Sequence, residues 1–185
     1  CGMVMALGGI VMTKFAVDLG WHPALAVLAG VGVTTLFGLI NGLLVTRVKL
    51  PSFIVTLGTM NIAFAITQLY SESQTVTDLP PSLTALGNTF NVAGTEVAWG
   101  TVLMVMLYLM AWFVLRETAA GRHVYAVGNN AEATRLVGIP TQRVLLMVYV
   151  MAGLFYGLAS MLSVARTGVG DPNAGQTENL DAITA

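Results

Sequence analysis

The polar side chains that could do chemistry are concentrated in one segment, residues 116–143, which lies between two strongly apolar runs. It holds four of the eight basic residues of the chain, Arg116, Arg122, Arg135 and Arg143. Lys and Arg are enriched in cytoplasmic loops, so this distribution places the segment inside the cell. A polar segment on the cytoplasmic face of a membrane protein is a surface on which a soluble partner can act.

Within this segment, the sequence predicts a short helix over residues 130–137. Asn129 is placed to cap its start, and Glu132 follows three residues later, as in an Asn version of the capping box. Gly138 followed by Pro140 ends the helix. A helix of eight residues is only about 12 Å long and is unstable in water by itself. It must therefore be held by its caps and by a partner.

Glu132 and Arg135 lie three residues apart and share one face of this predicted helix. Two roles are open for them. They pair with each other, which contributes at most about 0.5 kcal/mol, or they reach into a groove on a partner protein. In the second case, a charge left unpaired in a buried contact would cost about 2–5 kcal/mol.

Residues for catalysis or metal binding are scarce in this sequence. Cys1 is the only cysteine, and the two histidines are His22 and His123, so neither a Cys-based zinc site nor a multi-histidine site is expected. The sequence has no Gly-x-x-x-x-Gly-Lys-Ser/Thr motif for ATP. No Asp or Glu lies in the middle of an apolar run, which disfavours proton-coupled transport. We assign no catalytic residue, metal ligand or cofactor.

The elements that position these residues are membrane helices. Hydrophobic residues make up 56% of the chain and charged residues 9%, whereas soluble domains carry about 25% charged residues. The net charge of −1 gives no basic surface for nucleic acid. We predict an all-α, polytopic membrane protein with about five transmembrane helices and the short cytoplasmic helix. The apolar runs are residues 2–17, 23–46, 52–71, 98–115 and 144–165.

The charges between these runs predict the topology. Arg47 and Lys49 follow the second run, whereas the long connection 72–97 contains acidic residues and no Lys or Arg. We therefore expect 72–97 to be an external loop without an obvious regular element, which contacts an external partner or caps the bundle, 116–143 a cytoplasmic loop and 166–185 an external segment. The whole chain, 1–185, is then a single transmembrane domain, which we expect to be a fragment truncated at both ends.

Small residues recur every four positions along the second run, at Ala26, Gly30, Thr34, Gly38, Gly42 and Thr46. Gly153 and Gly157 repeat the spacing in the fifth run. Because lipid provides no hydrophobic drive for helix association, such stripes allow close packing. The stripe is either a static packing surface or a surface on which helices slide.

The third run has polar residues on two sides. Ser52, Thr56, Thr59 and Thr67 share one face, and Asn61 and Gln68 lie on the opposite one. The first face is our candidate substrate pathway. The alternative is that the Thr hydroxyls bond to their own helix and that the amides join neighbouring helices.

Three stretches resemble the sugar-import permeases of the ABC type, the ribose, xylose and fructose group. They are residues 121–139, the segment Pro172-Asn173-Ala174-Gly175 with Glu178-x-x-Asp181-Ala182-Ile183, and residues 50–59. The resemblance implies an ATPase-coupling region that includes Asn129, Asn130, Glu132, Ala133, Arg135 and Gly138. It also implies an external gate at Pro172, Asn173, Gly175, Glu178 and Asp181.

This resemblance implies a permease subunit, itself not an enzyme, that moves a pentose or hexose across a bacterial inner membrane. Its implied partners are a cytoplasmic ABC ATPase that supplies the energy, a periplasmic sugar-binding protein, a second permease copy in a homodimer, and membrane lipid. The alternatives are an ion-gradient-driven secondary transporter or channel, and an intramembrane enzyme, for which the sequence contains no catalytic constellation.

Overall fold

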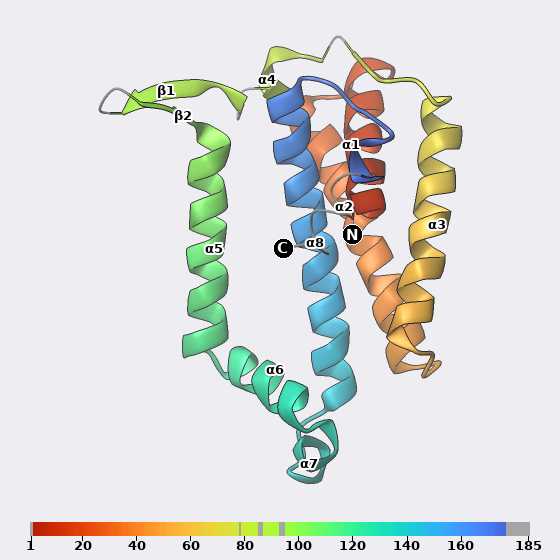
Figure 1. Ribbon diagram of the computed structural model, residues 1–185, viewed down its shortest axis with the longest axis vertical. Coiled ribbons are helices and arrows are strands. Elements are labelled where there is room, and N and C mark those ends of the chain that lie inside the picture. Colours follow the sequence, from red (N-terminus) through yellow and green to blue (C-terminus); the bar gives the residue numbers. More distant parts are fainter. Residues whose placement is uncertain (1, 78, 85–86, 93–94, 177–185) are drawn as a thin grey trace.

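The computed structural model describes residues 2–77, 79–84, 87–92 and 95–176 and shows a bundle of long helices (Figure 1). The elements are α1 (Gly2–Val17), α2 (Pro23–Thr46), α3 (Ser52–Ser71), α4 (Pro81–Thr84), β1 (Thr89–Val92), β2 (Thr95–Ala98), α5 (Trp99–Glu117), α6 (Ala119–Asn129), α7 (Ala131–Leu136) and α8 (Thr141–Thr167). The prediction of a polytopic α-helical membrane protein is confirmed.

Four of the described helices, α2, α3, α5 and α8, are long and apolar enough to cross a membrane. The remaining apolar run forms α1, which has 16 residues. At 1.5 Å per residue it is about 24 Å long, shorter than a hydrocarbon core of roughly 30 Å. Apolar residues surround its axis, and 12 of its residues are buried by α2, α3 and α8.

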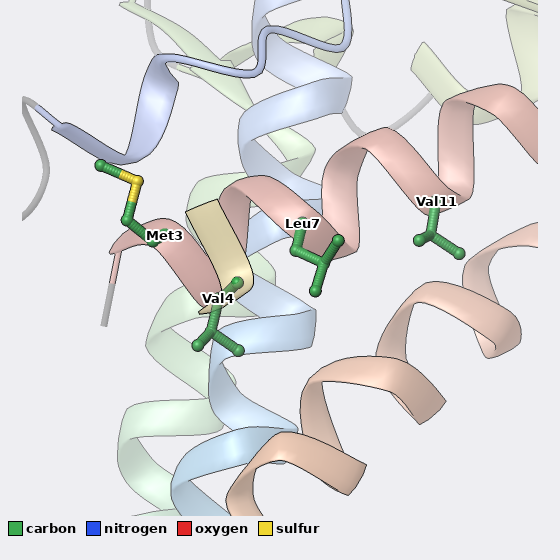
Figure 2. Packing of buried hydrophobic residues seen from close by; sticks show 5 residues of the cluster. Met3, Val4, Leu7 and Val11 are labelled. Atoms are coloured by element: carbon green, nitrogen blue, oxygen red, sulfur yellow. The ribbon is translucent and has the colours of Figure 1, made fainter. Parts of the chain in front are cut away.

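Helix α1 forms the core of the bundle. Its Met3, Val4, Leu7 and Val11 form a buried cluster with Ala63 of α3, and Figure 2 shows the four α1 side chains along that helix. Partly buried aromatic residues pack around the cluster, among them Phe37, Phe64 and Tyr156. Apolar side chains on all sides of α1 are buried because a neighbouring helix covers each side.

The small-residue stripe forms the packing surface of α2. Its six residues, Ala26, Gly30, Thr34, Gly38, Gly42 and Thr46, are the buried residues of that helix. A Cβ atom on Gly38 would collide with the backbone of Tyr149 and lie 3.1 Å from the Cα of Gly153. A Cβ on Gly153 would lie 2.6 Å from the Thr34 carbonyl oxygen. The backbones of α2 and α8 can approach this closely only because glycines face each other.

The connection 72–97 is more structured than we predicted. It contains the short helix α4 and an antiparallel hairpin in which Thr89 pairs with Ala98 and Val92 with Thr95. The expectation of a loop without regular elements was therefore wrong. In Figure 1 this hairpin joins the bundle to α5, which stands apart from the other long helices.

Candidate functional site

A cavity of about 160 Å³ lies between α1, α2, α3 and α8. Its polar lining residues are Asn41, Thr56, Thr59, Tyr149 and Tyr156, and Phe37 and Met60 are among its apolar ones. We call it the Asn41 cavity. Asn41 lies five residues before the end of α2, and Thr56 lies in the second turn of α3. The cavity is therefore nearer to the end of the bundle that carries α6 and α7 (Figure 1).

A hydrogen bond between Thr59 and Asn41 joins α3 to α2 at this cavity. The Thr59 Oγ1 atom lies 2.8 Å from Asn41 Oδ1 and 3.0 Å from the Val55 carbonyl oxygen. The Thr56 carbonyl oxygen lies 3.2 Å away, and because a hydroxyl has one hydrogen, Thr59 donates to one of these three acceptors. If it donates to a carbonyl oxygen, the Asn41 amide turns and donates its own N–H to Thr59. In both arrangements one polar end of the amide is left for the cavity.

The structure brings together two of the four predicted pathway residues. Thr56 and Thr59 both line the Asn41 cavity. Ser52 lies at the exposed start of α3, and Thr67 is fully buried and donates to the Ala63 carbonyl at 2.7 Å. Thr59 and Thr67 belong to the buried stripe of α3, so this helix face packs as well as lining the cavity.

The segment that follows α8 folds back against the bundle. Gly170 and Val76 exchange two backbone hydrogen bonds of 2.9 Å. Pro172 is fully buried, and Asn173 Oδ1 accepts a 2.9 Å hydrogen bond from Gln68 Nε2 on α3. Gly175 packs so closely on Gly2 that a Cβ on either would collide with the backbone of the other. Glu178 and Asp181, the other predicted gate residues, lie outside the described residues.

At the opposite end, α6 and α7 form a projecting unit between α5 and α8, which we call the α6–α7 tip (Figure 1). Asn130 caps α7, because its Oδ1 accepts the Ala133 N–H at 2.9 Å. The prediction that Asn129 is the cap was wrong, since Asn129 is the last residue of α6. Gly138, with φ of +90°, follows α7 as predicted.

The joint between α6 and α7 is tied by Thr134, which is buried. Its Oγ1 atom lies 2.9 Å from the Ala126 carbonyl oxygen of α6 and 2.7 Å from that of Asn130. Thr118 caps the start of α6, where its hydroxyl accepts the Gly121 N–H at 3.2 Å. Sequence analysis missed α6 because its polar residues were interpreted as loop.

The outer surface of α7 combines charged and apolar side chains. Arg135 Nη2 lies 3.4 Å from Glu132 Oε1, so the two residues pair. Both are mostly exposed, so water screens this ion pair and it contributes little stability. Leu136 and Val137 are each 80% exposed. Ala133 and Asn130 also line a shallow pocket between α6 and α7.

Sequence analysis also missed Asn41, Tyr149 and Tyr156. A usable signal existed for Asn41, because it is the only carboxamide in the apolar run 23–46. Neither tyrosine carries such a signal, because their position at a cavity depends on the packing of α8 against α2. Within the described residues, no group of three or more His, Cys, Asp or Glu could hold a metal ion.

Comparison with known proteins relates the whole chain to membrane permeases. A family described as branched-chain amino acid transport system, permease component, matches residues 1–185. The fructose import permease of Rhizobium meliloti is 41% identical over all of this chain and 52% of its own length. The ribose import permeases of Bacillus subtilis and Escherichia coli K12 are 34% and 32% identical over all of this chain and 56% and 57% of theirs.

The chain therefore spans about half the length of the curated relatives that it matches. No solved structure matches it. Its four spans and its relatives make it a multi-pass protein of a bacterial inner membrane. The family match covers residues 1–185, and the helical architecture with its projecting tip agrees with it. The chain therefore belongs to this family of transport-system permease components.

Proposed function

We propose that this chain is part of a permease subunit that moves a monosaccharide into a bacterial cell, powered by a separate ABC ATPase. The relatives are named as fructose, ribose and galactose import permeases. Import of a pentose or hexose is the activity that these names share. Ion-driven transport is disfavoured by the absence of Asp and Glu from the middle of the described spans.

The observation that carries this proposal is the α6–α7 tip. A helix of six residues, about 9 Å long, is too short to be stable alone. It nevertheless projects from the bundle with Leu136 and Val137 exposed beside the Glu132–Arg135 pair. Exposed apolar side chains next to charges are suited to a groove on a soluble protein. The proposed occupant of this surface is the ATPase, with Asn129, Asn130 and Ala133 shaping the contact.

We assign the entry of sugar to the end of the bundle opposite the α6–α7 tip. There the 72–97 connection and the segment 166–176 lie together through the Val76–Gly170 bridge. We assign to this surface the contact with a periplasmic sugar-binding protein, and to Pro172, Asn173 and Gly175 the external gate. The subunit pairs with a second copy, and the exposed apolar faces of α3 and α5 contact lipid or that copy.

The first test is topology. After Cys1 is replaced by Ser, single cysteines at Arg122 and Gln142 should react with a membrane-impermeant thiol reagent only from the cytoplasmic side. A cysteine at Gln74 should react only from outside. All three positions are exposed in the structure. Reaction of the Gln74 cysteine from the cytoplasm would show that the orientation is the opposite of the one proposed, with the α6–α7 tip on the side away from the ATPase.

The decisive test is transport by the full assembly in proteoliposomes, with radiolabelled fructose, ribose and galactose. ATP-driven import should continue when ionophores collapse every ion gradient and stop when ATP is withdrawn. Uptake that follows an ion gradient and ignores ATP would refute the proposal. Glu132→Ala should then weaken copurification with the ATPase or uncouple ATP hydrolysis from uptake, while the permease keeps its thermal stability.

A further inference from the structure

We infer that the Asn41 cavity binds one sugar ring during transport, with Asn41 as the hydrogen-bonding residue that recognises the sugar hydroxyls. This inference rests on the proposed function and adds the site and its specificity residue. It assigns roles to Asn41 and Tyr149, which the sequence motifs do not include. Thr56 and Thr59 line the same cavity.

The size of the cavity suits a single ring. Its volume of about 160 Å³ corresponds to roughly five water molecules at about 30 Å³ each. A pentose or hexose displaces a comparable volume, and a disaccharide displaces a larger one. The walls are held by the close packing of α2 on α8, because Gly38 lines the cavity and lies against the backbone of Tyr149. The space is therefore formed before the sugar arrives.

The chemistry of the lining matches the two kinds of surface that a sugar presents. Its hydroxyls are both donors and acceptors. Asn41 retains one polar end of its amide in either orientation, and the Thr56 and Thr59 oxygens can accept further bonds. The C–H faces of the ring are apolar, and Phe37, Tyr149 and Tyr156 bring aromatic rings to the same cavity.

Few polar groups line the cavity, and this limits how tightly it holds a sugar. Ligand sites typically combine an apolar lining with a small number of placed polar groups. A transport site must bind strongly enough to admit its substrate and weakly enough to release it. The cavity also contacts α8, whose first residue, Thr141, lies five residues beyond the end of α7. Movement of the α6–α7 tip therefore reaches a wall of the cavity through one continuous helix.

Asn41→Leu tests this inference with little change in packing volume. The Thr59 hydroxyl still has the Val55 carbonyl as acceptor, so the substitution leaves no buried donor unpaired. The matched control is Asn61→Leu on α3, since Asn61 is exposed and, among the described residues, bonds only to the Leu57 carbonyl of its own helix. Both variants are assayed in the full assembly for uptake of radiolabelled fructose, ribose and galactose, and for ATP hydrolysis without sugar.

Asn41→Leu should lower uptake of the transported sugar about tenfold, because a sugar hydroxyl loses its partner. Copurification with the ATPase should stay at the level of the Asn61→Leu control, whose basal ATP hydrolysis should equal that of the unmodified assembly. Full uptake by Asn41→Leu would overturn the inference and leave the proposed function intact. Absence of uptake of all three sugars by the unmodified assembly would instead refute the proposed function.

A direct binding measurement covers the case in which Asn41→Leu does not assemble. With Cys1 replaced by Ser, Val148→Cys and Asn61→Cys are labelled with a small methanethiosulfonate reagent, because Val148 of α8 lines the cavity and its replacement keeps Asn41 in place. The transported sugar should slow labelling of Val148→Cys and leave Asn61→Cys unchanged. Equal labelling rates of Val148→Cys with and without sugar would overturn the inference.

Discussion

Helices α1 and α5 are both strongly apolar, yet α1 is mostly buried in the bundle and α5 is exposed. In α1, 12 of 16 residues are buried, and α5 has no buried residue in its 19. Hydropathy does not separate the two helices, since both consist mostly of residues suited to lipid. Their side-chain sizes do separate them. Helix α1 includes Gly2, Gly8 and Gly9, which allow α8 and the segment after it to approach.

Large side chains cover α5, including Trp99, Tyr108, Trp112 and Phe113, all of them exposed. Such side chains keep a neighbouring backbone at a distance and are well solvated by lipid. Arg116 packs over the Trp112 ring at 5.3 Å, at the end of α5 that meets α6. The comparison shows that the small residues, more than the apolar ones, decide which helices pack together in this protein.

The largest effect should come from making the same truncation in both helices. Leu7 of α1 is 1% exposed and Leu109 of α5 is 58% exposed. Leu7→Ala should leave a cavity in the core and lower the free energy of unfolding by about 2–5 kcal/mol. Leu109→Ala should change it by less than about 0.5 kcal/mol. Unfolding in detergent measures both, and equal losses would abolish the distinction between the two helices.

The seam between α2 and α8 gives the second test. Gly38→Leu places a side chain against the backbone of α8 and should cost about 1–3 kcal/mol of stability. Gly32→Leu is its control on the same helix, because a Cβ on Gly32 meets nothing within 4 Å. The measurement is thermal unfolding in detergent. If Gly38→Leu has the same melting temperature as the unmodified protein, the small-residue stripe is not a packing surface.

A smaller effect is expected at the tip that joins α5 to α8. Asn130→Ala removes the cap of α7 and should destabilise that helix by about 1 kcal/mol. Asn129→Ala, one residue earlier, removes no cap hydrogen bond among those described for α7. Hydrogen exchange of the residue 131–136 amides reports the difference. Faster exchange in Asn129→Ala alone would mean that Asn129, and not Asn130, is the N-cap of α7.

The smallest expected effect is at the contact between α3 and the segment after α8. Gln68→Leu removes the hydrogen bond to Asn173, an exposed contact of about 0.5–1 kcal/mol. Protease susceptibility of residues 168–176 should rise slightly, with the global melting temperature almost unchanged. The control is Gln74→Leu in the neighbouring connection. A large fall in melting temperature would mean that this segment belongs to the core.

The bounds of α1, α2 and α3 could be predicted from sequence because a long apolar run between polar residues leaves the backbone no alternative in lipid. The cap of α7 could not, because Asn129 and Asn130 are equally good caps by local rules. Only the presence of α6, which continues through Asn129, decides between them. Thr56 and Thr59 were predicted as a face of α3, whereas the arrival of Asn41 beside them depends on how α2 crosses α3.

Thr134 at the joint of α6 and α7 has a mechanical consequence. Its hydroxyl lies 2.9 Å from the Ala126 carbonyl oxygen of α6, so bending the joint would lengthen or break this contact, whereas the contact with Asn130 stays within α7. A force applied to α7 is therefore transmitted to α6, and the two helices move together. The link to α8 is closed in a similar way, because the Ile139 N–H donates to the Thr134 carbonyl oxygen at 3.3 Å and the Gly138 N–H to the Arg135 carbonyl oxygen at 3.0 Å. A displacement of α7 is therefore passed on to α8 as well.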